Sequence, residues 1–364
     1  MIKVLHTEWS DGWGGQEIRI INEMIAVREK NIEVYLACRN QAKIKQKAIE
    51  NDIRVFTLPF DGAYDIKTIR ALIKIIKENG IDIVNTHSGK DTWTGGIAAK
   101  LAGVKFIRTR HLSNPINPSR FNFINELADF IFTTGESVKN AMIKNNRIKP
   151  EKIMSVPTGI DENIFDPKKY DSLKIREKYG IKKDEITIGI IAVLRGFKRH
   201  EMFIDMANLI SKKFPKCKFF IAGEGPRRAI IENLIKEKNL ETKIQLLGHI
   251  DDPFSLLSAL DIFVLTSDKN EGVPQSIIQA LMMNKAVIAT DVGGTKDLLN
   301  NNNFFILAPN NLQQLVRTIT LLIENKTLRE TYASSARNSI LKKFSQTHMA
   351  ENIKNIYNLT LGIK

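Results

Sequence analysis

Short segments rich in branched and aromatic residues alternate with amphipathic segments along the chain, and this alternation restricts the fold more than any other feature. The helical stretches follow the 3.6 period, as in 66–77, which has apolar residues at 66, 69, 72, 73 and 76. Such alternation predicts an α/β fold with parallel sheets. We expect strands over 2–6, 32–38, 53–58, 81–87, 104–110, 129–134 and 152–157, then over 186–194, 216–223, 243–249, 261–266, 285–291 and 304–308.

The two series of strands predict two domains. The region between them lacks strand signals, carries Pro167 and is crowded with Lys, Asp and Glu. A chain of 364 residues is too long for one ordinary core and suits two. We expect one doubly wound domain over 1–165, a linker over 166–185, a second domain over 186–344, and a helix over 345–364 that packs back on the first. Ligands of such sheets bind at the carboxyl ends of the strands.

Composition narrows the choice of partners. No segment approaches the 18 to 20 apolar residues that span a bilayer, and 1–6 lacks the features of a signal peptide, so we expect a cytoplasmic protein. The net charge of +14 suits phosphorylated ligands or an anionic membrane surface. No basic stripe with interleaved aromatics is present, so no nucleic-acid partner is expected. Cys38 and Cys217 lie in apolar runs and are expected to be reduced core thiols.

The segment after strand 261–266 carries the strongest sign of a binding site. A polar loop with Glu271 and Gly272 precedes a helix whose first turn we expect to contain Pro274. A helix amino terminus offers free amides to an anion, and Gly272 allows the backbone to approach closely. Glu271 and Gln279 are then placed to contact different parts of one elongated ligand. The alternative is an ordinary strand–helix turn with a surface glutamate.

Other glycine-containing motifs accompany this segment in a definite order. They are Gly14-Gly15-Gln16-Glu17, Val156-Pro-Thr-Gly-Ile-Asp161 with Phe165, Gly223-Glu-Gly-Pro226, Gly248, and Asp291-Val-Gly-Gly294 after strand 285–291. With Glu-Gly-x-Pro-x-x-x-x-Gln-Ala, this series resembles the retaining glycosyltransferases of family four over nearly the whole chain. The resemblance implies a GT-B fold, in which two Rossmann-like domains face each other across a cleft.

The resemblance also implies an activity and its participants. A sugar would pass from a nucleotide-diphosphate sugar, held mainly by the second domain, to a glycan or lipid-linked acceptor on the first. Relatives of this kind act in surface polysaccharide or lipopolysaccharide synthesis, and some work peripherally at the inner membrane face. The catalytic candidates are His111, Glu271, Lys198 and Arg195. The donor-binding candidates are Gly15, Gly223, Gly225, Gly272, Val273, Pro274 and Gln279. The acceptor-side candidates are His87, Ser88, Lys90 and Asp91.

The chemistry of the reaction gives several of these residues a role. Charge develops on the leaving diphosphate, and Lys198 and Arg195 after strand 186–194 would stabilise it. No Asp-x-Asp motif is present, so we expect neither a metal nor another cofactor. His87 and His111 each follow a strand of the first sheet, which favours a site, whereas His6, His200, His249 and His348 are interpreted as structural. Retention would proceed by front-face substitution, in which the leaving phosphate helps to deprotonate the acceptor.

The chain departs from the family pattern at three positions. Gln279 replaces the family's second glutamate, Thr158 replaces an asparagine, and Arg195 is displaced by two positions. The glutamine keeps an oxygen that accepts hydrogen bonds, so contact with the nucleotide ribose remains expected.

Three other functions compete with this interpretation. A nucleotide-sugar epimerase or hydrolase would use the same fold without a second sugar. A dinucleotide dehydrogenase does not fit, because Gly12-x-Gly14-Gly15 is not Gly-x-Gly-x-x-Gly. A nucleic-acid-binding protein would depend on net charge alone.

Overall fold

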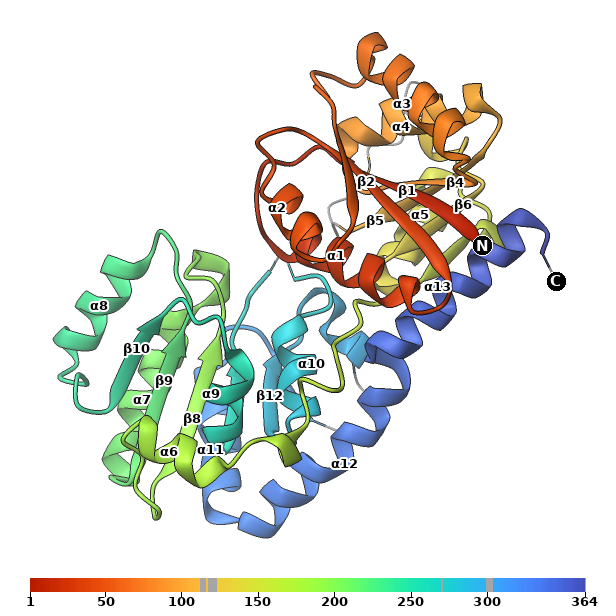
Figure 1. Ribbon diagram of the computed structural model, residues 1–364. Helices are drawn as coiled ribbons and strands as arrows, with labels where there is room; N and C mark the ends of the chain where they lie inside the picture. Colours follow the sequence, from red (N-terminus) through yellow and green to blue (C-terminus); the bar gives the residue numbers. More distant parts are fainter. Residues whose placement is uncertain (112–115, 117–122, 270, 299–303, 364) are drawn as a thin grey trace. The chain divides into compact units, whose positions relative to one another are not determined.

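The computed structural model describes residues 1–111, 116, 123–269, 271–298 and 304–363. The chain divides into two compact units (Figure 1). The first comprises Met1–Gly159 together with Gln346–Lys364, and the second comprises Ile160–Ser345. The boundary therefore lies before the expected position at 165, because Ile160 and Phe165 pack in the core of the second unit.

The first unit is built on a seven-stranded parallel sheet with the order β3-β2-β1-β4-β5-β6-β7. Its strands are β1 (Ile2–Glu8), β2 (Ile32–Cys38), β3 (Arg54–Thr57), β4 (Ile83–Thr86), β5 (Lys105–Arg110), β6 (Phe130–Thr133) and β7 (Ile153–Ser155). Its α-helices are α1 (Gly15–Arg28), α2 (Lys43–Glu50), α3 (Ile66–Asn79), α4 (Gly89–Ala102), α5 (Glu136–Asn146) and α13 (Gln346–Leu361). The strand order reverses between β1 and β4, the position where ligands of such sheets bind.

The second unit repeats this plan with a six-stranded parallel sheet of order β10-β9-β8-β11-β12-β13. Its strands are β8 (Ile186–Ile191), β9 (Cys217–Ala222), β10 (Ile244–Gly248), β11 (Ile262–Leu265), β12 (Ala286–Thr290) and β13 (Phe305–Leu307). Its α-helices are α6 (Ser172–Lys178), α7 (His200–Lys213), α8 (Arg228–Glu237), α9 (Pro253–Ala259), α10 (Gln275–Met282), α11 (Leu312–Glu324) and α12 (Lys326–Phe344). Here the order reverses between β8 and β11.

Each expected strand is present, and the predicted α/β class is confirmed. The helix that periodicity predicted over 66–77 is α3, and it begins at Ile66 as expected. The Asp65 carboxylate accepts from the amides of Lys67 and Thr68 and caps the helix, and Gly80 ends it at a φ of 62°. Its inward face buries Ile69, Leu72, Ile75 and Ile76. Cys38 and Cys217 are both free and buried.

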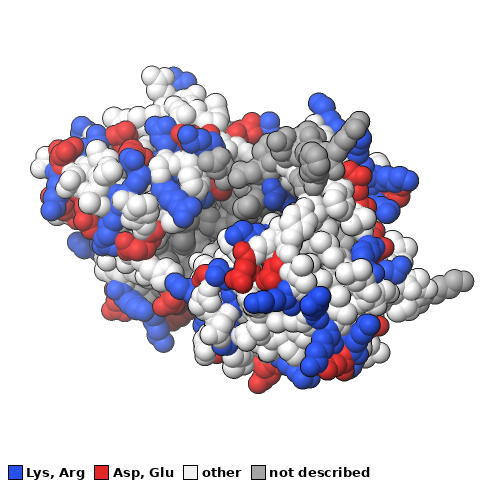
Figure 2. Space-filling model, turned by 90° about the horizontal axis from the view of Figure 1, so that it is seen from above, with Lys and Arg blue, Asp and Glu red and all other residues white. Residues whose placement is uncertain are grey.

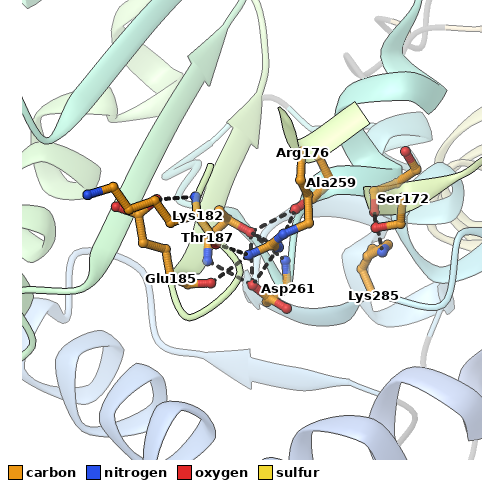
Figure 3. Close-up of polar contacts among 9 residues, drawn as sticks. Ser172, Arg176, Lys182, Glu185, Thr187, Ala259, Asp261 and Lys285 are labelled. Atoms are coloured by element: carbon orange, nitrogen blue, oxygen red, sulfur yellow. Dashed lines mark hydrogen bonds and ion pairs between the residues drawn. The ribbon is translucent and has the colours of Figure 1, made fainter. Parts of the chain in front are cut away.

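The segment 166–185, predicted as a linker, contains α6 and belongs to the second unit. The Arg176 guanidinium donates to the backbone oxygens of Glu185 at 2.6 Å and Ala259 at 2.9 Å, and pairs with Asp261 at 3.2 Å (Figure 3). The same Asp261 oxygen accepts from the Thr187 amide at 2.8 Å. These contacts attach α6 to the ends where β8 and β11 begin, because Thr187 lies at the start of β8 and Asp261 immediately precedes β11.

Helix α13 returns to the first unit and packs against α1 (Figure 1). Its apolar face joins the core beneath β1 and β2 through Met349, Ala350, Ile353 and Tyr357. The end of the chain thereby completes the core of the unit in which the chain begins. Within the described residues, no helix has the length and apolar character needed to cross a membrane.

Candidate active site

A buried ion pair joins two loops at the carboxyl ends of β8 and β11. Lys198 Nζ lies 2.5 Å from Glu271 Oε1, and the two side chains are 13% and 7% exposed. The Ser267 hydroxyl donates to the same carboxylate oxygen. Glu271 Oε2 accepts no hydrogen bond from the residues that the structure describes. One oxygen of Glu271 is therefore held by the protein, and the predicted contact of Glu271 with a sugar stays a prediction.

Backbone crowding explains the glycines opposite Glu271. A Cβ at Gly293 would lie 1.9 Å from the carbonyl oxygen of Glu271, and the φ of this glycine is +56°. The Gly294 amide donates to the Gly272 carbonyl oxygen at 3.0 Å, and a Cβ at Gly294 would lie 2.9 Å from that oxygen. Only glycine fits at position 293, and its lack of a side chain lets the turn after β12 pack directly against the backbone of the loop that carries Glu271.

The second glycine pair shapes the turn that follows β8. A Cβ at Gly223 would lie 2.0 Å from the Ala192 carbonyl oxygen, and one at Gly225 would lie 2.7 Å from that of Leu194. Strand β8 consequently ends at Ile191, not at the expected 194, because the chain turns there against these glycines. Gly223 and Gly225 contact protein backbone, and their predicted contact with a sugar nucleotide stays a prediction.

The loop that carries Lys198 is hydrogen-bonded to Thr266, the residue that follows β11. The Thr266 hydroxyl donates to the carbonyl oxygens of Lys198 at 2.8 Å and Arg199 at 3.1 Å. Arg195, three residues before Lys198, is exposed to solvent. Sequence reasoning did not select Thr266 or Ser267, although both follow β11 in the same polar loop.

Helix α10 begins one residue later than expected. It starts at Gln275, and Pro274 is the N-cap with an extended ψ of 113°. Gly272 and Val273 precede it in the loop, and apart from the chain neighbours of Gly272 no described atom lies within 4 Å of where its Cβ would stand. Gln279 is half-buried, in the second turn of this helix. The loop, the helix start and Gln279 thus follow one another along one edge of the second unit.

In the first unit, three histidines form a continuous row. His6 Nδ1 lies 2.9 Å from His87 Nε2, and His87 Nδ1 lies 2.9 Å from His111 Nε2. They come from β1, from the end of β4 and from the end of β5. Burial lowers the pKa of His6 to about 3 and those of His87 and His111 well below the ordinary value. All three rings are therefore neutral at pH 7.

The remaining acceptor-side candidates lie around Asp91. Its carboxylate accepts from the amides of His87 and Ser88, both at 2.9 Å, and from the Thr7 hydroxyl at 2.8 Å. Burial is the main cause of the raised pKa of Asp91. Lys90 is exposed and places its ammonium 4.2 Å from the centre of the Trp9 ring. His87, Ser88 and Asp91 are thus brought together, while Lys90 extends over the neighbouring loop.

The glycine loop after β1 begins α1. Gly15 is the first residue of the helix, and the Gly14 amide donates to the Glu17 carboxylate at 2.8 Å. Glu8 at the end of β1 accepts from the Ser10 amide at 2.7 Å. Burial, followed by the charge of Asp91, raises the pKa of Glu8 to about 8. Gly15 therefore lies at a helix amino terminus, beside the end of β1.

A buried polar network connects α1 to the strand ends and α13. Arg19 Nη1 donates to the Thr158 hydroxyl at 3.1 Å, and its Nη2 lies 3.5 Å from the Glu23 carboxylate. Asn85 donates to Glu23 at 3.2 Å and to the Tyr357 hydroxyl at 3.5 Å. Thr158, which departs from the family pattern, thus serves as an acceptor for Arg19.

The face drawn in Figure 2 and the metal-binding residues that the structure describes give no sign of another kind of site. On the face drawn in Figure 2, basic and acidic side chains are interspersed. Across the described part of the chain, no group of three His, Cys, Asp or Glu side chains could hold a metal ion.

Comparisons with known proteins agree across both units. Residues 13–164 match the family model described as Glycosyltransferase Family 4, and residues 171–339 match Glycosyl transferases group 1. The chain is 25% identical to UDP-Gal:alpha-D-GlcNAc-diphosphoundecaprenol alpha-1,3-galactosyltransferase of Escherichia coli, over 98% of this chain and 96% of that protein. It is also 25% identical to the capsular polysaccharide biosynthesis glycosyltransferase CapM of Staphylococcus aureus, over 92% of each chain.

Solved structures show the same fold. A glycosyltransferase from Rickettsia africae ESF-5 has a TM-score of 0.90 at 23% identity and covers 99% of this chain and 98% of its own. Anabaena Alr3699/HepE in complex with UDP-glucose has a TM-score of 0.81 at 20% identity, over 99% of this chain and all of its own. The expected GT-B fold is confirmed.

Proposed function

The chain belongs to the glycosyltransferases of family four, and from that membership we propose that it transfers a sugar from a nucleoside-diphosphate sugar to a glycan or lipid-linked acceptor, with retention of configuration. This proposal depends on the buried pair of Lys198 and Glu271, which places a cation and a carboxylate with one oxygen unoccupied by the described residues at the strand ends of one sheet. The relatives named for capsule and diphosphoundecaprenol-linked substrates support a role in cell-surface polysaccharide or lipopolysaccharide synthesis.

The second unit would bind the nucleotide sugar. Lys198, with Arg195, meets the negative charge that grows on the diphosphate as the glycosidic bond breaks. Amides at the start of α10 and the open space at Gly272 suit the approach of a phosphate. Glu271 Oε2 accepts from a sugar hydroxyl, and Gln279 accepts from the ribose. The cations come from the chain itself, so the proposed reaction needs no metal.

The sugar would keep its configuration by front-face substitution. Glu271 binds hydroxyls and does not attack the anomeric carbon, since Lys198 and Ser267 hold one of its oxygens. The leaving phosphate accepts the proton of the acceptor hydroxyl as the new bond forms. Ser88 and Lys90 of the first unit would bind the acceptor, with His87 and Asp91 buried beside them, and His111 would bind a hydroxyl of the donor sugar.

The first unit would also bind an anionic membrane surface from the cytoplasmic side. Helix α3 exposes one face of basic side chains next to exposed apolar ones. The basic residues are Lys67, Arg70, Lys74 and Lys77, and the apolar ones are Tyr64 and Ile66. The apolar face of α3 is packed in the core, so the attraction to anionic lipid headgroups would come from these exposed basic side chains.

The test begins with donor binding. A thermal-shift series of uridine, guanosine and adenosine diphosphate sugars identifies the donor, since a ligand at roughly 100 times its Kd stabilises the protein by about 2.7 kcal/mol. Lys198→Met should abolish most of the shift. A matched control is Lys216→Met, because Lys216 also pairs with a carboxylate, at 2.7 Å, but is 73% exposed and lies near the start of β9.

Two further measurements separate the alternatives. The double variant Lys198→Met/Glu271→Gln removes the carboxylate charge left by the single change, so a folding defect is distinguished from lost binding. With the donor known, nucleotide release is followed with and without acceptor. Release that needs an acceptor supports transfer, whereas equal release without one indicates a hydrolase. Wild-type donor binding by Lys198→Met and by the double variant would refute the proposed donor site.

A further inference from the structure

The row of His6, His87 and His111 restricts where its protons lie. The ring centroids of His6 and His87 are 5.2 Å apart with the planes 9° from parallel, and those of His87 and His111 are also 5.2 Å apart. Each neighbouring pair shares one nitrogen–nitrogen contact of 2.9 Å. A neutral imidazole has one nitrogen that donates and one that accepts. Two such contacts along three neutral rings therefore require that every ring donate in the same direction.

Only two arrangements satisfy this requirement. In one, all three rings carry the proton on Nδ1, so that His6 donates to His87 and His87 donates to His111. In the other, all three carry it on Nε2, and the direction of donation is reversed. His87 uses both of its nitrogens within the row. Among the residues that the structure describes, His111 uses only Nε2 in the row, so its Nδ1 is the ring nitrogen left for a ligand.

The far end of the row distinguishes the two arrangements. His6 Nε2 is buried and has no hydrogen-bond partner within the described chain. With protons on Nδ1, this atom is a buried lone pair. With protons on Nε2, it is a buried N–H without an acceptor, the kind of orphan that folded proteins rarely contain. The first arrangement is therefore favoured.

We propose that His6 and His87 are positioning residues that hold His111 in its Nδ1–H form, so that His111 donates a hydrogen bond to an oxygen of the bound sugar. The identity of that oxygen rests on the proposed function, whereas the protonation of the three rings does not. His111 then acts as an electrophilic contact and not as a base, because its lone pair is already occupied by His87. His6, buried in β1, thereby acts through His87 on the proposed site.

Nitrogen NMR of the full chain with 15N-labelled histidine tests the proposal directly. Two-bond proton–nitrogen correlations at neutral pH show which ring nitrogen of each of the six histidines bears the proton. We expect Nδ1 for His6, His87 and His111. His6→Asn keeps an N–H near the position of Nδ1 and should preserve this form at His111. His6→Leu removes the hydrogen-bond donor, so His111 should show the Nε2–H form or a mixture.

Matched variants and a second readout complete the test. His200→Leu removes a buried histidine of the second unit and should leave the His111 signals unchanged. Turnover should fall roughly tenfold in His6→Leu, the equivalent of one lost hydrogen bond, and recover in His6→Asn. Protonation of His111 on Nε2 in the wild type would overturn the proposal, as would an unchanged Nδ1–H form in folded His6→Leu. If the chain transfers no sugar, the spectra still decide the protonation.

Discussion

Replacement of Arg176 by methionine should destabilise the second unit without touching the proposed site. The Arg176 side chain is 12% exposed, and its guanidinium contacts three backbone oxygens as well as the Asp261 carboxylate. Its removal leaves the Glu185 carbonyl oxygen without this donor. The aspartate is less affected, because it is 29% exposed and keeps the amide and the hydroxyl of Thr187.

The magnitude follows from these contacts. Breaking a fully buried ion pair costs about 3–5 kcal/mol, and partial exposure of Asp261 with its retained partners lowers our expectation to about 2–4 kcal/mol. For a unit of this size, each kcal/mol lowers Tm by about 2–4 °C, so the transition should fall by roughly 4–16 °C.

Calorimetry of the full chain measures this change as a shift of the transition of the second unit. Two units need not unfold together, so the two transitions are fitted separately. Lys174→Met is the matched control on the same helix. Its ion pair with Asp171 is 3.7 Å long and its side chain is 83% exposed, so its Tm should change by no more than about 1 °C. Equal melting of Arg176→Met and Lys174→Met would refute the reasoning that α6 is held by the buried guanidinium.

Three other outcomes are expected. Activity should survive EDTA, and a loss that Mg²⁺ or Mn²⁺ restores would contradict the proposed role of Lys198 and Arg195. Binding to anionic vesicles should fall as salt rises, since exposed charges are screened over about 10 Å at 0.1 M. The double variant Lys67→Gln/Lys74→Gln should weaken this binding by about 2 kcal/mol. Equal binding to neutral vesicles would argue against the proposed membrane contact. Gln279→Ala should raise the KM for the sugar nucleotide about five- to thirtyfold with little change in kcat, whereas Gln279→Glu should be tolerated. An unchanged KM in Gln279→Ala would remove Gln279 from the proposed site.

Much of the fold could be predicted from residues close together in the chain. Strand segments, the start of α3 and the tandem α/β plan follow from periodicity, which depends on neighbours within a few turns or pleats. The loop from Glu271 to Gln279 could likewise be selected, because strand, glycine, proline and helix follow one another in the sequence. The linker expectation was wrong for α6, since charge density in 166–185 gave no sign of the buried contacts of Arg176.

Only the tertiary structure decided which residues that are distant in the sequence contact one another. His6 belongs with His87 and His111 only because β1 lies beside β4, and β4 beside β5, in the sheet. Nothing in the spacing of these histidines predicts that strand order. Similarly, Lys198 pairs with Glu271 because β8 is adjacent to β11 across the reversal of the second sheet. The sequence by itself determined which segments become strands and which loops carry reactive groups; the order of strands, set by packing of whole helices and sheets, decided which of those groups touch.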